Sequence, residues 1–146
     1  MLQLSIITPE QTVFSGTVEQ VTLRTTDGEI TVLPHHQPLV SVLAPGELRF
    51  RSAGKEIPMS IAGGFVEVFP GSRVAVLADD AQRVEEMDLV AIEAAQERAR
   101  QVLLGTRHAD DVSFASAAAA LEKELARARV ARKYRGGRTV PPLRHE

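Results

Sequence analysis

Apolar and polar residues alternate with a period of two along the first part of the chain, up to about residue 80. The alternation recurs in eight short stretches, at 4–6, 21–23, 30–32, 40–42, 48–50, 57–61, 66–68 and 74–76. It places one side of each strand in a core and the other in water. Turn-forming pairs such as Pro45-Gly46 and Pro70-Gly71 separate the stretches. Strands this short and closely spaced predict an antiparallel sandwich or barrel, and Pro58 places its own strand at an edge.

The period changes to that of a helix after Asp79-Asp80. Apolar residues then recur at steps of three and four, at Ile92, Ala95, Ala99 and Val102. They predict a helix from about residue 85 to residue 104. Its first turn would hold three acids, which favour the positive end of the helix dipole: Glu85, Glu86 and Asp88.

A second helix is predicted after the polar break at 105–111. Ser113 is its candidate N-cap, and Gly136-Gly137 would end it. Its apolar stripe consists of Phe114, Ala118, Leu121, Leu125 and Ala128. The predicted fold class is therefore α+β. Residues 1–84 form an N-terminal antiparallel β-sandwich, and residues 85–146 form a C-terminal antiparallel two-helix hairpin.

The seam of this hairpin is rich in alanine, at positions 91, 94, 95, 99, 115 and 117–120. Alanine lets two helices approach closely but buries little apolar area. Such a hairpin is weak by itself, so we expect it to depend on the sandwich or on a partner. It is a candidate moving part.

Charge is unevenly distributed, although the net charge of the 146 residues is only −2. Residues 1–122 hold 17 acidic and 9 basic side chains, a net of −8, whereas residues 123–146 hold 8 basic and 2 acidic ones, a net of +6. A basic end on an acidic body indicates a segment that meets an acidic surface. No apolar run approaches the roughly 18 residues that cross a bilayer, and the N-terminus lacks the pattern of a secretory signal.

The candidate chemistry is sparse. The chain has no cysteine, so disulfides and thiol catalysis are excluded. His35 and His36 share one loop, but neighbouring residues of an extended segment point in opposite directions. The other histidines, His108 and His145, lie elsewhere, and a closed zinc site needs about four ligands. We therefore predict no metal site and, in the absence of a catalytic motif, a protein that is not an enzyme.

The basic end could bind nucleic acid by neutralising phosphates. It carries one aromatic residue, Tyr134, so it offers no platform on which bases could stack. A docking face for an acidic protein surface is the better interpretation.

Several motifs together resemble the epsilon subunit of rotary F-type ATP synthases, over nearly the full chain. They include ITPEQTVFSG at 7–16, GEITVLPHHQPL at 28–39, PGELR at 45–49, AGGFVEV at 62–68 and VAVLAD at 74–79. The second is similar to the family's pattern G-E-x-G-x-x-P-x-H-x-P-L, with Thr31 where the family often has glycine. The resemblance implies about ten strands in the sandwich and a place in the central rotor stalk, where the subunit is not catalytic.

The resemblance also implies partners. The sandwich would bind the gamma subunit and rest on the ring of c subunits, with Glu29 and His36 at the ring contact. The helices would rise to block ATP hydrolysis, docking on an acidic segment of the beta subunit through Arg127, Arg129, Arg132 and Lys133. The subunit would be peripheral, held by the complex on the cytoplasmic face of a bacterial cell membrane.

Some bacterial members of that family bind ATP on the hairpin through a motif like I/L-D-x-x-R-A and later arginines. Here Asp88 matches the aspartate, but Ala91 and Ile92 stand at the arginine and alanine positions. The later basic positions are matched by Arg98, Arg127 and Lys123. Losing one bidentate donor and replacing another by a point charge weakens phosphate recognition. The sequence therefore predicts no tight ATP site and no cofactor.

Two other classes of function stay open from the residues alone. A small β-barrel metalloenzyme would use His35 or His36, and a nucleic-acid-binding module would use the basic end. Metal analysis tests the first, and a salt-dependent shift with DNA tests the second.

Overall fold

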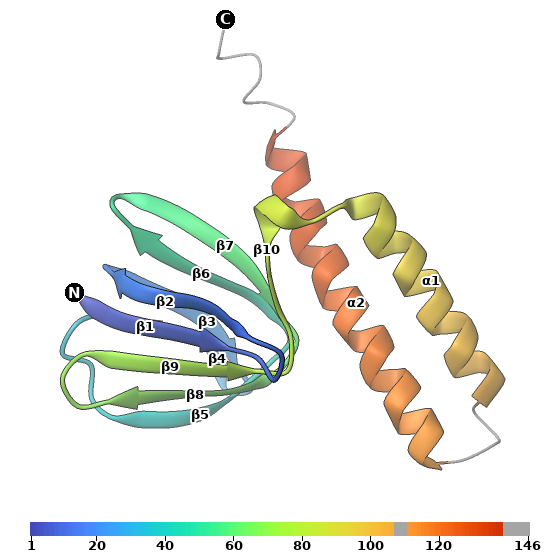
Figure 1. Cartoon of the computed structure of the whole chain (residues 1–146), viewed down its shortest axis with the longest axis horizontal. Helices are drawn as coiled ribbons and strands as arrows, with labels where there is room; N and C mark the ends of the chain where they lie inside the picture. The colour runs from blue at the N-terminus through green and yellow to red at the C-terminus, as the bar shows by residue number, and fades with distance from the viewer. Residues whose placement is uncertain (107–110, 139–146) are drawn as a thin grey trace, which may run out of the picture.

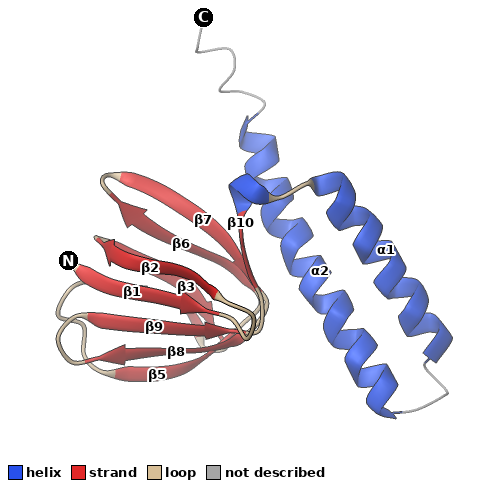
Figure 2. Cartoon of the chain, in the orientation of Figure 1, coloured by secondary structure: helices blue, strands red, loops and turns tan. Residues whose placement is uncertain are grey.

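The computed structural model describes residues 1–106 and 111–138, and for residues 106, 111–113 and 135–138 it describes the backbone alone. The strands come first (Figure 1): β1 (Leu2–Ile7), β2 (Thr12–Val18), β3 (Gln20–Thr25), β4 (Gly28–Val32), β5 (Leu39–Leu43), β6 (Gly46–Ser52), β7 (Lys55–Ile61), β8 (Gly64–Phe69), β9 (Arg73–Ala78) and β10 (Ala81–Arg83). A 3₁₀ turn, η1 (Val84–Glu86), leads to α1 (Leu89–Thr106) and α2 (Asp111–Arg138). Strands and helices occupy opposite sides of the molecule (Figure 2). The predicted class, a β-sandwich followed by a helical hairpin, is confirmed.

The ten strands form one hydrogen-bonded network that folds over on itself. Its order is β10-β7-β6-β3-β5-β8-β9-β1-β2, with β4 paired to β3. The end strand β2 packs back on β6, where the rings of Phe14 and Phe50 lie 4.4 Å apart. One pair departs from the predicted antiparallel pattern, because β1 runs parallel to β9. These two strands are far apart in the sequence, so no tight hairpin forces them to be antiparallel.

The main core lies inside this folded sheet. Its largest fully buried side chains come from both layers: Phe50, Leu2, Leu4, Ile6, Leu23, Leu48 and Met59. Phe14, Val13 and Ile57 pack on it from the rim. The hairpin has a much smaller core of Ile92, Ala128 and Ala131, with Met87 and Leu89 against it. The apolar burial that stabilises the fold is therefore concentrated in the sandwich.

The edge position predicted for the strand of Pro58 is correct only in part. β7 is next to last in the order, because β10 pairs with Met59, Ser60 and Ile61. This pairing ends just before Pro58, which pairs on its other side with Arg49 of β6. Pro58 cannot donate a ladder hydrogen bond, so it lies where the outer neighbour is already missing.

The helix ends differ from their predicted positions. Glu85 and Glu86 lie in η1, and Asp88 precedes α1, where its Oδ1 accepts a hydrogen bond from the Val90 N–H at 3.0 Å. This is the geometry of an N-cap, which satisfies an amide that has no partner within the helix. α2 begins at Asp111, before Ser113, and continues through Gly136-Gly137 to Arg138. Each glycine in a helix costs about 1 kcal/mol relative to alanine. The cost at these two positions is not enough to end the helix.

α2 lies between the sandwich and α1 (Figure 1). It therefore buries two faces, one of which holds Ala128 and Ala131 against Ile92 of α1. The other includes Val130, which faces the sandwich. The predicted apolar stripes are not fully buried where α1 ends and α2 begins: Val102 is 54% exposed and Phe114 is 40% exposed. The predicted alanine seam is also narrower, because only Ala117 of those alanines is buried.

Candidate functional site

An ion pair joins α2 to the sandwich. Arg127 donates from Nε and Nη2 to Oδ2 of Asp80, at 3.0 and 2.6 Å, and from Nη1 to Oε1 of Glu124 at 3.2 Å. The side chains of Arg127 and Asp80 are only 20% and 19% exposed. Hydrogen bonds between charged groups are stronger than neutral ones, and partial burial reduces their screening by water. This contact holds the middle of α2 against the loop between β9 and β10.

A second polar contact lies closer to the C-terminal end of α2. Glu47 of β6 accepts a hydrogen bond from Lys133 Nζ at 2.6 Å and another from the hydroxyl of Tyr134. Arg49 Nη1 lies 3.5 Å from the same carboxylate, which is only 11% exposed. The largely covered carboxylate of Glu47 thus accepts two hydrogen bonds from α2 and forms an ion pair with Arg49.

The four basic residues predicted to dock on a partner are not equivalent in this structure. Arg127 and Lys133 bind the sandwich, and Arg132 donates to Glu93 of α1 at 2.9 Å. Arg129 is exposed, and its guanidinium has no hydrogen bond or ion pair with any described residue. Two of the four, Arg127 and Lys133, therefore hold the hairpin against the sandwich, and Arg132 joins its two helices.

Sequence reasoning missed the two acids that receive these cations, Asp80 and Glu47. Both belong to the segment with a net charge of −8, and their partners belong to the segment with a net charge of +6. This imbalance was the available signal. It indicated an acidic surface, which the sequence analysis places on another protein, whereas in the structure the chain supplies one itself.

The loop that carries His35 and His36 lies between β4 and β5 and is held to the turn after β8. The backbone N–H of His35 donates to Ser72 Oγ at 2.9 Å, and that of His36 donates to the Leu33 carbonyl at 3.2 Å. The ring of His36 makes its hydrogen bond at Nδ1 with the adjacent Gln37 carbonyl, at 2.7 Å. No group of three metal-ligating side chains occurs in the described residues, and His108 and His145 lie outside them.

Glu29 and His36, the predicted ring contacts, lie at opposite ends of β4. Glu29 is near the start of the strand, at the end that faces α2, and its carboxylate lies 3.6 Å from Arg49 Nη1. His36 follows the other end of the strand. The structure therefore does not bring the two side chains into one cluster.

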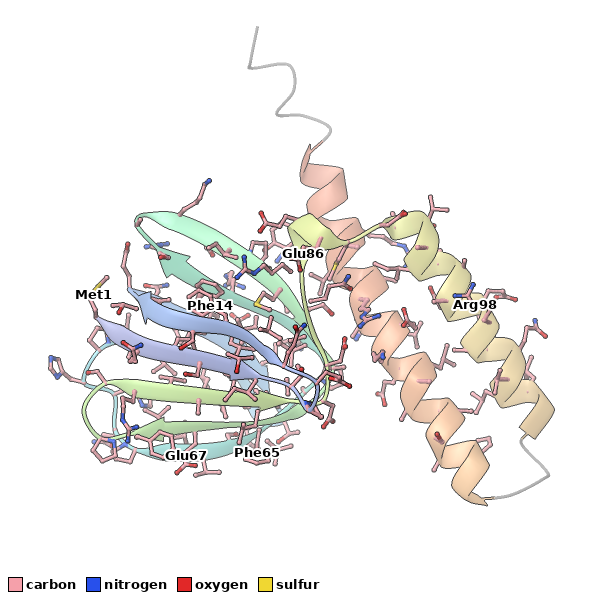
Figure 3. All side chains as sticks on the ribbon, viewed as in Figure 1. Met1, Phe14, Phe65, Glu67, Glu86 and Arg98 are labelled. Atoms are coloured by element: carbon pink, nitrogen blue, oxygen red, sulfur yellow. The ribbon has the colours of Figure 1, made fainter. Side chains whose placement is uncertain are left out.

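The residues of the nucleotide motif are brought together only in part. Asp88, Ala91 and Arg127 line one small pocket of about 200 Å³, but Arg98 is not among its lining residues and is exposed on α1 (Figure 3). Lys123 is not among them either. The pocket also holds the carboxylates of Glu86 and Glu124.

The same pocket presents hydrogen-bond acceptors. Buried oxygens of Gln82 and Glu124 accept no hydrogen bond within the described part of the chain. Arg127, the one cation among the described residues that line it, is already paired with Asp80 and Glu124. Oxygen acceptors and carboxylates repel a phosphate chain. The pocket of about 200 Å³ is also smaller than usual small-molecule sites, which have a volume of about 300–1,000 Å³.

An apolar patch lies on the outer face of β5 and β8. Val40, Val42 and Phe65 are 65%, 58% and 44% exposed, and Val42 pairs directly with Phe65 across the two strands. The alternation at 40–42 predicted that the two valines face the core, and this prediction is wrong, because Leu39 and Leu43 flank the same stretch and supply a second apolar set with the opposite phase. In the structure Leu43 is buried and the two valines point outward. Adjacent large apolar side chains at a surface indicate a binding face.

Comparison with known proteins follows the division of the fold. The family model described as the β-sandwich domain of the ATP synthase delta/epsilon chain matches residues 1–84. The chain belongs to the ATP synthase delta/epsilon chain family. An ATP synthase epsilon chain of Herpetosiphon aurantiacus is 39% identical over 134 residues, which cover 92% of this chain and 96% of that one. One of Shouchella clausii is 41% identical over 92% of this chain and 97% of its own length. The alignments with these epsilon chains extend beyond the sandwich into the helices.

Solved structures support the same family. A chain of the Euglena gracilis mitochondrial ATP synthase, in a structure of OSCP, F1 and c-ring, superposes with a TM-score of 0.65 at 29% identity, over 83% of this chain and 75% of that one. A chain of the Tetrahymena thermophila mitochondrial enzyme, in a structure of the central stalk and c-ring, gives a TM-score of 0.54 at 18% identity, over 91% and 95% of the two chains, which shows a shared fold. No described helix is long and apolar enough to cross a membrane.

Proposed function

We propose that this chain is a non-catalytic subunit of the central stalk of a rotary ATP synthase, where it couples rotation of the c-ring to ATP synthesis in the catalytic head. One observation carries the proposal: epsilon chains match at about 40% identity across the sandwich and most of the helices. Both parts of the molecule are therefore those of an epsilon chain.

The sandwich would attach the subunit to the rotor. The patch of Val40, Val42 and Phe65 would receive the gamma subunit, because burying three exposed apolar side chains favours association by about 25 cal/mol per Å² of apolar area. The loop of His36, stiffened by Pro34 and Pro38 and tied to Ser72, would contact the c-ring, with Glu29 as its second contact.

The hairpin would act as a brake on ATP hydrolysis. In the structure it is folded against the sandwich, and Arg127 and Lys133 are bound to Asp80 and Glu47. Release of these pairs would free α2 to rise and present Arg127, Arg129, Arg132 and Lys133 to acidic residues of the beta subunit. An α-helix rises about 1.5 Å per residue, so α2 is long enough to extend well away from the sandwich.

The remaining assignments follow from the same role. The subunit would use no cofactor or metal, bind no nucleic acid and bind ATP weakly at most at Asp88, Arg98 and Arg127. It would lie on the cytoplasmic face of a bacterial membrane and be held there by the complex.

The test uses the tagged full-length chain in cells whose ATP synthase contains it. Purification through the tag is expected to bring down the gamma subunit and the c-ring, and failure to do so contradicts the stalk role. Deletion of residues 113–146 is expected to raise ATP hydrolysis while assembly and synthesis persist. Unchanged hydrolysis at both low and high salt contradicts the role of the hairpin as a brake, but it does not contradict the stalk role.

A further inference from the structure

The loop between β4 and β5 begins with a tight turn that runs from Leu33 to His36. The His36 N–H donates to the Leu33 carbonyl at 3.2 Å, which closes the turn. Pro34 is its second residue and His35 its third, and the φ of His35 is +69°. A positive φ at the third position, after a proline, is characteristic of a type II turn, where glycine is preferred. His35 is therefore held in a left-handed conformation that its Cβ disfavours.

A type I turn is the alternative for the same four residues. It differs mainly in the peptide between Pro34 and His35, which is turned over. Both turn types keep the hydrogen bond from His36 to Leu33, so this bond does not select between them. The type I turn gives its third residue a negative φ, which suits histidine better. A contact from outside the turn must therefore favour type II.

Ser72 supplies this contact from the turn between β8 and β9. Its Oγ accepts a hydrogen bond from the His35 N–H at 2.9 Å, across 37 positions of the chain. The Ser72 carbonyl in turn accepts a hydrogen bond from the Gln3 N–H of β1 at 2.9 Å. Both turns lie at the end of the sandwich that is remote from the helices (Figure 1). The sheet therefore fixes the position of the acceptor that the loop binds.

The orientation of this one peptide decides which polar group the loop exposes. The peptide is trans, so its N–H and C=O point in opposite directions. Because the His35 N–H is directed at Ser72, the Pro34 carbonyl points away from the β8–β9 turn, and it accepts no hydrogen bond from a described residue. A turned-over peptide would present the N–H there instead. A peptide flip thus exchanges an acceptor for a donor next to His36.

We propose that Ser72 is a positioning residue, which holds the Pro34–His35 peptide so that its carbonyl oxygen is offered to a hydrogen-bond donor of the c-ring. The inference rests on the proposed function, in which this loop meets the ring. Ser72 would act through the loop and needs no contact of its own with the ring. A group that is fixed before contact binds better, because less conformational freedom is lost on association.

The first test is NMR spectroscopy of the purified full-length chain. In a type II turn the Pro34 Hα lies close to the His35 amide hydrogen, so a strong cross-peak joins them, and turning the peptide over weakens it. Ser72→Ala is expected to shift the ratio of the two turns toward type I by about twofold to tenfold, the effect of losing one hydrogen bond. The matched control is Ser52→Ala in β6, whose hydroxyl has no partner among the described residues, and it is expected to leave the cross-peak unchanged.

Two further variants separate the hydrogen bond from other effects of the substitution. Ser72 has a φ of +59°, and Ser72→Asp retains an acceptor on a residue that tolerates this conformation, so it is expected to keep the type II turn. Adding His35→Gly to Ser72→Ala is also expected to restore type II, because glycine adopts a positive φ without strain. A defect confined to the β8–β9 turn would not be corrected by a change in the other turn.

The second test is proton-driven ATP synthesis by the complex assembled with each variant. Synthesis is expected to fall in Ser72→Ala by up to the factor measured for the turn, and to recover in Ser72→Asp and in the double variant. Three results overturn the inference: an unchanged cross-peak in Ser72→Ala, a double variant that stays in the type I turn, or a flipped turn with unchanged synthesis.

Failure of this inference is distinguishable from failure of the proposed function. If the tagged unsubstituted chain recovers the gamma subunit and the c-ring, the stalk role stands whatever the Ser72 variants do. If it does not, the stalk role itself is contradicted. Thermal melts verify folding of every variant. Should Ser72→Ala not fold, Ser72→Gly decides the question, because it removes the same hydroxyl and leaves no strained Cβ.

Discussion

Arg127 of α2 binds a single carboxylate oxygen of Asp80 through two of its nitrogens, at 3.0 and 2.6 Å, although 47 positions separate the two residues in the chain. Both side chains are about four-fifths buried. Asp80 lies in the loop just before β10, the strand that leads into the hairpin. The loop at the start of the helical segment and the middle of its last helix are therefore held together by one ion pair.

Removing the charge of Asp80 is expected to loosen the hairpin. In Asp80→Asn the folded position of α2 loses hydrogen bonds to a charged group, which contribute about 1–3 kcal/mol. The chain has no cysteine, so spin labels at Glu10→Cys and Ser116→Cys report the distance between sandwich and α2. We expect a second population at longer distance.

The control is Asp79→Asn, which removes the same charge from an exposed neighbour that has no ion pair with the described residues. It is expected to leave the distance distribution unchanged. If both variants behave alike, net charge and not the contact with Arg127 governs the hairpin.

The loop prediction concerns coupling to the ring. Glu29→Ala combined with His36→Ala is expected to leave the fold intact, because both side chains are at least partly exposed and a pair such as Glu29–Arg49 contributes about 0–1 kcal/mol. Proton-driven ATP synthesis by the complex should fall. Since the two residues lie at opposite ends of β4, the single variants show which end meets the ring. Loss of stability with synthesis untouched would refute a contact role.

The apolar patch on β5 and β8 is expected to carry affinity for the gamma subunit. Val42→Ser with Phe65→Ser removes two exposed apolar side chains, so stability should change by less than about 1 kcal/mol while recovery of gamma through the tag decreases sharply. The matched control is Val90→Ser on α1, which is 69% exposed but lies off the patch. Equal recovery of gamma in the two variants would exclude the patch.

The uneven burial predicts how fragments behave. Residues 1–84 contain the whole main core and should fold alone, with a cooperative melt measured by circular dichroism. Residues 85–146 retain only the small core around Ile92 and should be marginally helical, because helical stability in proteins comes mostly from packing. A cooperative melt of the second fragment would show that the hairpin does not need the sandwich.

Gly64 is expected to be essential for the sandwich. Its φ is +115°, and an added Cβ would lie 2.0 Å from the Leu77 carbonyl oxygen on the paired strand β9. Gly71 has a φ of +85° but nothing within 4 Å of that position. Gly71→Ala should cost about 1–2 kcal/mol, the left-handed penalty. Gly64→Ala should cost more than about 4 kcal/mol or prevent folding. Similar urea midpoints for the two variants would contradict this difference.

The sequence by itself determined the order and type of the elements, because periods of two and of 3.6 are local properties that neighbouring residues carry. The motif around Gly28 and the glycine pair at Gly63-Gly64 determined the family in the same way. The sequence also showed that charge divides between the two halves of the chain.

Only the tertiary structure decided which faces are buried and where the charges pair. Alternation leaves the phase of a strand open when apolar residues occupy both sets of positions, so Val40 and Val42 could be placed outward only once β8 was beside them. The parallel pairing of β1 with β9 depends on residues 70 positions apart. The pairing of Arg127 with Asp80 and of Lys133 with Glu47 arises because α2 lies on β6 and β7. No local pattern records that contact, since the free energy that fixes it comes from the packing of separate elements.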